Sequence, residues 1–213
     1  MKKRILIAVF ISMILSFYTT GCVKIIKQGE EAALINESSF DAVSNVADIW
    51  ESVALPELQG KAVELSQFLT EAKGDMMSLA DQYGKRTQGT EGAVSFTVKG
   101  LARVDSVFTE SAAGYMLISV DGYTGAEVIK LQTGTVFKGT AVRDSLDIIK
   151  FNDYKNQVDY AAVSTSIHGK IKETVYGDMD VTSLTGKQIE FVGCFTFSKN
   201  EELIITPVLM TVK

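Results

Sequence analysis

The chain has few of the residues on which many enzymes and metal proteins depend. Its 213 residues include one histidine, His168, and two cysteines, Cys22 and Cys194. If Cys22 is modified, as argued below, one histidine and one cysteine remain, too few for a usual zinc site or for an internal disulfide. No GxSxG, P-loop or GxGxxG motif occurs, and nothing pairs two carboxylates specifically. We therefore expect no catalytic residues, metal or cofactor, and we interpret Cys194 as a small buried apolar residue.

Prolines and basic residues are also few. Two prolines against 17 glycines favour bends and turns over rigid linkers. The chain has 21 basic and 26 acidic residues, and removal of three basic residues near the N-terminus leaves 18 against 26, a net charge of −8. Because such a surface repels a phosphate backbone, nucleic acid is not an expected partner.

The N-terminus has the layout of a secretory signal. Three basic residues precede an apolar run over 5–15, which is shorter than the roughly 20 residues of a membrane span. Cys22 follows a glycine, as at a bacterial lipoprotein cleavage site, although Thr19 stands where a large apolar residue is usual. We predict a signal peptide over 1–21, an acylated Cys22 that holds the protein to the periplasmic or extracytoplasmic face of a membrane, and a connector over 22–37. The alternatives are an uncleaved anchor or secretion with a free thiol.

Residues 38–88 are predicted to form a small helical subdomain. Ser38 or Ser39 can cap a first helix that has Asp41 in its first turn. Apolar residues then recur at spacings of three and four, the pattern of one helical face: Phe40, Val43, Ala47, Trp50 and Ala54. A second stripe starts after Pro56, breaks at Gly74–Asp75 and resumes as far as Gly84: Leu58, Ala62, Leu65, Leu69, Ala72, Met76, Leu79, Ala80 and Tyr83.

Residues 89–213 change to the period of two that is typical of strands. A long first strand bends at Gly100, a helix capped by Asn152 or Asp153 ends before Gly169, and Pro207 marks an edge or a bulge. The apolar face of that helix is predicted to be Tyr154, Val158, Ala161 and Ala162. The strands are expected over 94–108, 115–120, 126–131, 135–142, 170–176, 188–197 and 203–212. This order predicts an α+β protein in which the helical subdomain precedes an OB-like antiparallel β-barrel with one helix between strands, and a generic antiparallel sandwich is the alternative.

The densest polar segment, over 138–163, holds the candidate binding residues for a ligand or partner: Arg143, Asp144, Asn152, Asp153, Asn156, Gln157 and Tyr160. Asp153, Asn156, Gln157 and Tyr160 would share one side of the predicted helix, and Arg143 could pair with Asp144 or with a helix carboxylate. An arginine and amides at a barrel mouth suit hydroxyl or carboxylate ligands. The alternative, which we favour, is a helix cap with a buried polar network that locks the helix to the sheet.

The segment GTVFKGTAVRDSLDIIKFNDYKNQVDYAAV, residues 134–163, resembles a pattern of the DUF2291 family of bacterial lipoproteins, and LTGKQIEFVGCFTF, residues 184–197, fits it as well. Thr135 stands where the family has proline, and His168 lies near an expected asparagine. The resemblance implies a helical subdomain joined to an OB-like barrel, and it carries over no catalytic residue. It also implies a function beside ABC-type sugar importers of the ribose kind, since members are commonly encoded next to them.

These observations lead us to expect a non-enzymatic envelope lipoprotein that assists a sugar transporter. Its partners would be the membrane, through the lipid, and the permease, the solute-binding protein or a sugar. One alternative is an enzyme acting on envelope carbohydrates, which would need two carboxylates roughly 5 to 9.5 Å apart in one cleft. Another is a purely structural envelope protein, in which the polar cluster would be buried and satisfied.

Overall fold

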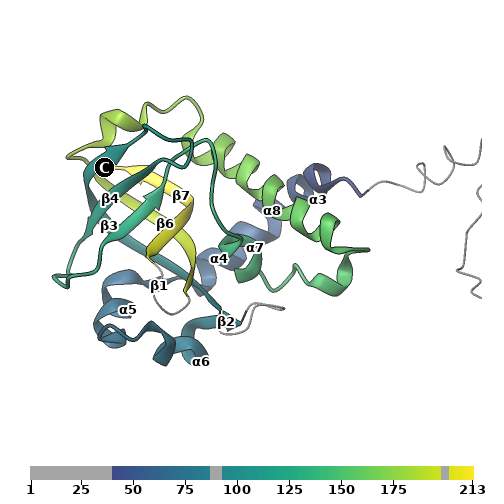
Figure 1. The fold of residues 1–213 in the computed structure, drawn as a ribbon, viewed down its shortest axis with the longest axis horizontal. Helices are drawn as coiled ribbons and strands as arrows, with labels where there is room; N and C mark the ends of the chain where they lie inside the picture. Colours follow the sequence, from purple (N-terminus) through teal and green to yellow (C-terminus); the bar gives the residue numbers. More distant parts are fainter. Residues whose placement is uncertain (1–39, 87–92, 198–201) are drawn as a thin grey trace, which may run out of the picture. The chain divides into compact units, whose positions relative to one another are not determined.

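The computed structural model describes residues 40–86, 93–197 and 202–213 (Figure 1). From Asp41 to Lys213 the chain forms one compact unit. The predicted signal peptide and connector, with Cys22, and the predicted boundary between residues 88 and 89 lie outside the described residues. Within the described part, no helix has the length and apolar character needed to cross a bilayer.

The first described helix, α3 (Ala42–Ile49), begins one turn later than the sequence suggested. Asp41 is its N-cap, and its carboxylate accepts hydrogen bonds from the backbone N–H groups of Val43 and Ser44. The prediction of a serine cap with Asp41 inside the first turn is therefore wrong. The buried face is also shifted by one residue, since Ala42 and Val46 are buried and Val43 is 69% exposed.

The rest of the helical region is broken into short pieces. The helical chain continues through a π-turn (Trp50–Ala54) and α4 (Leu55–Lys61), then switches to a two-residue strand, β1 (Val63–Glu64), parallel to β3. The part of the predicted second stripe before Gly74 is therefore divided between two helices, α4 and α5 (Leu65–Ala72). The predicted break at Gly74 is confirmed, because Lys73 and Gly74 both have positive φ. A 3₁₀ turn (Met76–Leu79), α6 (Ala80–Tyr83) and β2 (Gly84–Arg86) follow.

The sheet contains the strands that the alternating pattern predicted. They are β3 (Val94–Phe108), β4 (Tyr115–Val120), β5 (Ile129–Gln132), β6 (Gln188–Phe197) and β7 (Leu203–Val212). β3 pairs with β4 through its second half and with β6 through its first, β4 pairs with β5, and β7 pairs with β5 and β6. The β5–β7 and β1–β3 pairings are parallel, so the sheet is mixed and not antiparallel throughout.

Irregular register occurs where the strands change partners. Pro207 faces Gly193 where the β6–β7 register shifts, which confirms the bulge expected at this proline. β3 runs without interruption through Gly100, and its own irregularity against β4 lies between Val104 and Ser106.

Two segments predicted as strands differ in the structure. Residues 135–142 do not extend the sheet, because the side chain of Gln132 binds the backbone N–H and carbonyl of Lys138 and the chain then turns at Gly139, with φ of 81°. The short helix α7 (Ala141–Ser145) follows. Residues 170–176 are not a strand, since α8 (Gln157–Ile171) runs past Gly169 into a π-turn (Lys172–Tyr176).

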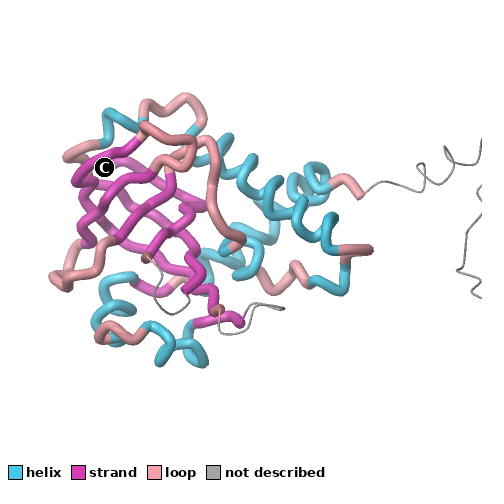
Figure 2. Tube along the Cα trace, viewed as in Figure 1, coloured by secondary structure: helices cyan, strands magenta, loops and turns pink. Residues whose placement is uncertain are grey.

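The remaining elements are short and join the strands and helices above. A 3₁₀ turn (Phe151–Asp153) precedes α8, and another (Val181–Leu184) precedes β6. Figures 1 and 2 show α5 and α6 against one end of the sheet, with α3, α4, α7 and α8 at its side. Side chains of α5 reach the sheet core, where Phe68 packs edge-on against Phe96 and Phe195 at centroid distances of 4.9 and 5.8 Å.

Candidate functional site

The seven candidate residues of the polar segment separate into a buried group and an exposed group. Arg143 and Asp144 lie in α7 and are 7% and 5% exposed, and Tyr160 lies in α8 against them. Asn152, Asp153, Asn156 and Gln157 are exposed, in the 3₁₀ turn and at the beginning of α8.

Arg143 is fully engaged by its neighbours. Its Nε and Nη2 donate to Oδ1 of Asp144 at 2.8 and 2.7 Å. Its Nη1 donates to the backbone carbonyl of Tyr160 at 3.2 Å, and the guanidinium lies 3.8 Å from the centroid of the Tyr160 ring. The predicted pairing of Arg143 with Asp144 is confirmed.

Asp144 likewise has both carboxylate oxygens in use. Oδ2 accepts from the hydroxyl of Thr140 at 2.6 Å, and the Tyr160 hydroxyl donates to Oδ1 at 3.4 Å. Burial is the main reason that the pKa of Tyr160 is raised, so the phenol stays neutral and remains a donor. The three side chains join α7 to α8 as a satisfied network, so a ligand carboxylate would first have to displace Asp144.

The exposed candidates are arranged differently from the prediction. Asn156 is the N-cap of α8, since its Oδ1 accepts from the backbone N–H of Asp159 at 2.9 Å. Asp153 precedes this cap in a separate 3₁₀ turn, so the expectation that Asp153, Gln157 and Tyr160 share one helix face is wrong. The predicted apolar face of α8 is also wrong, because Val158 is 76% exposed and the buried residues are Val163, Ser164, Ile167 and Ile171.

Exposed apolar side chains occur in the segment between α7 and α8 and in the first turn of α8. Ile148 and Phe151 are 37% and 40% exposed, and Val158 is more exposed still. The rings of Phe151 and half-buried Tyr154 pack on Tyr160 at centroid distances of 5.3 and 5.5 Å. We call Ile148, Phe151, Tyr154 and Val158 the 148–158 face. The sequence pattern did not reveal it, because Tyr154 and Val158 were assigned to the apolar face of the predicted helix and Ile148 and Phe151 to no face.

The backbone that leads into this face is clamped from the helical region. Lys61 donates to the carbonyl of Ser145 at 2.7 Å, Lys85 donates to that of Leu146, and Glu57 accepts from the N–H of Asp147 at 2.6 Å. Burial tends to raise the pKa of Asp147, but hydrogen bonds from Lys85 and Lys61 outweigh it and lower that pKa. These long-range contacts fix the end of α7 and were not apparent from the sequence.

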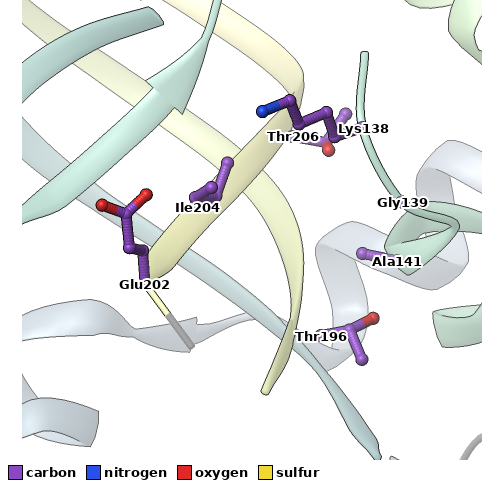
Figure 3. Close-up of a pocket in the computed structure, with 7 residues that line it drawn as sticks. All are labelled: Lys138, Gly139, Ala141, Thr196, Glu202, Ile204 and Thr206. Atoms are coloured by element: carbon purple, nitrogen blue, oxygen red, sulfur yellow. The ribbon is translucent and has the colours of Figure 1, made fainter. Parts of the chain in front are cut away.

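A hollow lies where the beginning of α7 meets strands β6 and β7. A pocket of about 240 Å³ is bounded by the turn at Lys138, by Ala141, and by Thr196, Ile204 and Thr206 of strands β6 and β7 (Figure 3). Among the described residues, no three or more His, Cys, Asp or Glu side chains are grouped so as to hold a metal ion. Burial raises the pKa of the Cys194 thiol to about 11, which disfavours the thiolate at this fully buried position.

His168 gives the protein a testable pH dependence. Burial, with the positive charges of Lys172 and Arg143, lowers the pKa of this imidazole to about 4. Its ring packs edge-on against Phe137 at 5.6 Å. In the unfolded chain the imidazole gains its proton near pH 6.5. Between pH 4 and pH 6.5 the unfolded state binds more protons than the folded state. The contribution of neutral His168 to the free energy of unfolding is therefore complete above pH 6.5 and is lost as the pH falls toward 4.

The expected loss at pH 4 is well below the roughly 3 kcal/mol that the full shift would give at about 1.4 kcal/mol per pKa unit, because solvent screens the partly exposed imidazole. Urea unfolding of the wild type and of His168→Gln at several pH values measures it. Because His168 is the sole histidine, the variant should have a flatter stability profile between pH 6.5 and pH 5. The same slope in both proteins would contradict this account of His168.

A search of solved structures places the fold. The chain is similar to a crystal structure of an OB-fold protein from Thermotoga maritima, with 16% sequence identity and a TM-score of 0.64 over 82% of this chain and 99% of the other. At this identity the likeness shows the fold alone, α+β with an OB-like mixed sheet. No curated protein matches the chain.

A family model gives the assignment of the chain. The model of DUF2291, described as a predicted periplasmic lipoprotein, matches residues 12–211, and so covers the end of the predicted apolar run, the helical region and the sheet. The chain therefore belongs to the DUF2291 family of predicted periplasmic lipoproteins.

Proposed function

We propose that this protein is a non-enzymatic accessory of an ABC-type sugar uptake system, anchored by a lipid on Cys22 and bound to the permease through the 148–158 face. The observation that carries the proposal is that face, where apolar and aromatic side chains stay exposed above a buried, satisfied ion pair. Single exposed apolar residues are ordinary, but a group held on a rigid support is typical of a protein contact.

The lipid anchor favours the permease over a soluble partner. Cys22 is joined to α3, which begins after Asp41, and residues 23–40 can span at most about 60 Å. An acylated Cys22 would therefore confine the folded unit to a shell above the bilayer in which the permease is embedded. α3 packs against α8, the helix that carries Val158. The helix that follows the predicted tether in the sequence is therefore a neighbour of the helix that carries Val158.

The composition of the face suits a protein partner more than a nucleic acid or a bare sugar. The exposed polar residues beside it include Asn152, Asp153 and Gln157, and the buried Arg143 beneath it donates to Asp144, which also accepts from Thr140. Such a polar rim around an aromatic centre is the usual anatomy of a transient interface. Phe151, with its ring on Tyr160, is the expected anchor.

Site-specific photocrosslinking in cells tests the proposal. A photoreactive benzoylphenylalanine at Val158 should crosslink to the permease of a sugar importer, and Phe151→Ala should reduce the permease affinity about tenfold, as for a typical interface anchor. The matched control places the same group at Val128, which is 61% exposed in the connection between β4 and β5 and should give no permease adduct. Fatty-acid labelling of the wild type and not of Cys22→Ser tests the anchor.

Each outcome separates the parts of the proposal. Adducts with a solute-binding protein and not with the permease would mean that the partner is the solute-binding protein. Equal crosslinking from Val128 and Val158 would mean that the 148–158 face is not the binding surface. Loss of the permease adduct in Cys22→Ser is expected because the unanchored protein is diluted away from the membrane. Wild-type protein without fatty-acid label would overturn the anchor.

A further inference from the structure

We infer that the pocket between the 138–141 segment and strands β6 and β7 binds a small hydroxylated carboxylate, a molecule of the hydroxy-acid or sugar-acid class. The pocket has a volume of about 240 Å³, and Lys138 in its lining is exposed to solvent. That is below the usual range for drug-sized ligands, so it suits a small molecule. It is separate from the 148–158 face and goes beyond the proposed transport role.

The charge of the pocket favours an anion. Lys138 is exposed, and its ammonium forms no hydrogen bond or ion pair with the described residues. Figure 3 shows its side chain extending from the turn toward β7. Glu202, the carboxylate in the lining, is neutralised by Lys130, whose Nζ lies 2.7 Å from Oε1. Within the described part of the chain, the lining therefore holds one positive charge that no carboxylate compensates, and a ligand carboxylate is its natural partner.

Hydroxyl groups line the inner wall. Thr206 is 1% exposed, and its Oγ1 accepts from Nε2 of Gln132 at 2.7 Å, which leaves its own O–H free to donate. Thr196 shares a hydrogen bond with Ser95 at 2.9 Å. Ala141 and Ile204 supply the apolar contact for a short carbon skeleton. Hydroxyls beside a cation suit a ligand that carries both a carboxylate and hydroxyl groups.

The pocket wall is held in place before any ligand arrives. Gln132, 4% exposed, accepts from the backbone N–H of Lys138 at 2.6 Å and donates to the carbonyl of the same residue at 3.1 Å. The hydroxyl of Tyr176 in turn holds Gln132 in place by donating a hydrogen bond to the backbone carbonyl of Gln132. One buried amide thus joins the turn that carries the ammonium to the strand that carries the Thr206 hydroxyl. Such rigid support lowers the entropic cost of binding.

Calorimetric titration of the full-length protein in detergent micelles tests the inference, with gluconate as the probe and ribose as its neutral counterpart. Saturable binding of gluconate and not of ribose is expected. Lys138→Gln should weaken gluconate binding at least about tenfold, the usual effect of losing a hydrogen bond to a charged group. Ile204→Phe should abolish it by filling the pocket.

Two matched variants keep the test specific. Lys150→Gln removes an exposed positive charge outside the pocket lining, and Val128→Phe adds an aromatic ring to an exposed site elsewhere. Both should bind gluconate like the wild type, and the thermal unfolding midpoint of each variant reports its folding. Equal binding of ribose and gluconate, binding unaffected by Ile204→Phe, or no saturable gluconate binding would each overturn the inference.

Discussion

Replacement of Asp144 by alanine is expected to lower the free energy of unfolding by about 3 to 5 kcal/mol. The substitution removes the acceptor of both the Nε and Nη2 hydrogen bonds of Arg143, a residue that is 7% exposed. A buried guanidinium then remains without its counter-charge, and the hydroxyl of Thr140 loses its partner. Urea unfolding followed by circular dichroism and by the fluorescence of Trp50, the sole tryptophan, measures the loss.

A double variant separates the value of the pair from the cost of breaking it. Arg143→Met combined with Asp144→Ala removes both charges, so its stability should lie much closer to the wild type than that of Asp144→Ala. The exposed pair of Arg86 and Asp81, whose side chains are 63% and 90% exposed, is the matched control. Asp81→Ala should change stability by less than about 1 kcal/mol. A loss below 1 kcal/mol in Asp144→Ala would mean that water or a rearranged neighbour replaces the carboxylate.

The same contacts explain why the sequence identified these residues but not their role in the site. The sequence predicted that Arg143 could pair with Asp144, and it does, but it did not predict that the ring of Tyr160 would pack on the guanidinium. Their burial depends on how α7 lies against the sheet and α8, which local sequence does not encode. The pocket was missed for a related reason. Lys138, Thr196 and Thr206 come from three separate segments, and no sequence spacing links them.

The sheet was predicted more accurately than the helices. In β6, Ile189 and Phe191 are buried and alternate with more exposed residues, and the predicted ends of this strand agree with the structure. The pattern failed over 170–176, where Ile171 and Val175 are buried four residues apart, a helical spacing. A short segment with few apolar residues fits either the strand period or the helical period. Tertiary contacts therefore decided which structure it forms.

The register of α3 shows a second kind of ambiguity. Two overlapping faces, one with Val43 and Ala47 and one with Ala42 and Val46, both include Trp50, and in both the residues recur at helical spacings of three or four. Small apolar residues give no preference between them. The cap at Asp41 makes Ala42 the first residue of the helix. Packing against α8 then buries Val46 and leaves Val43 in solvent.

Replacement of Phe68 by alanine is the second large effect, and it tests whether the helical region and the sheet fold together. Phe68 belongs to α5 and is fully buried, with its ring against Phe96 of β3 and Phe195 of β6. Removing an aromatic ring from such a core typically costs about 3 to 5 kcal/mol. A small part is the lost edge-to-face geometry, and most is the cavity left between helix and strands.

The core around Phe68 is shared, so the whole unit should respond to its loss. Leu65 and Leu69 of α5 pack in the same cluster as Val98 and Phe191 of the sheet. Trp50 fluorescence reports the helical region and far-ultraviolet circular dichroism reports all elements. Both should move to lower urea by the same amount and remain coincident, as in one two-state transition. Phe151→Ala, at an exposed ring, is the control and should stay within about 1 kcal/mol of the wild type. Two separated transitions would mean that the helices before residue 88 unfold as a subdomain of their own, whereas one shared transition makes the α5 contact part of the same cooperative core as the sheet.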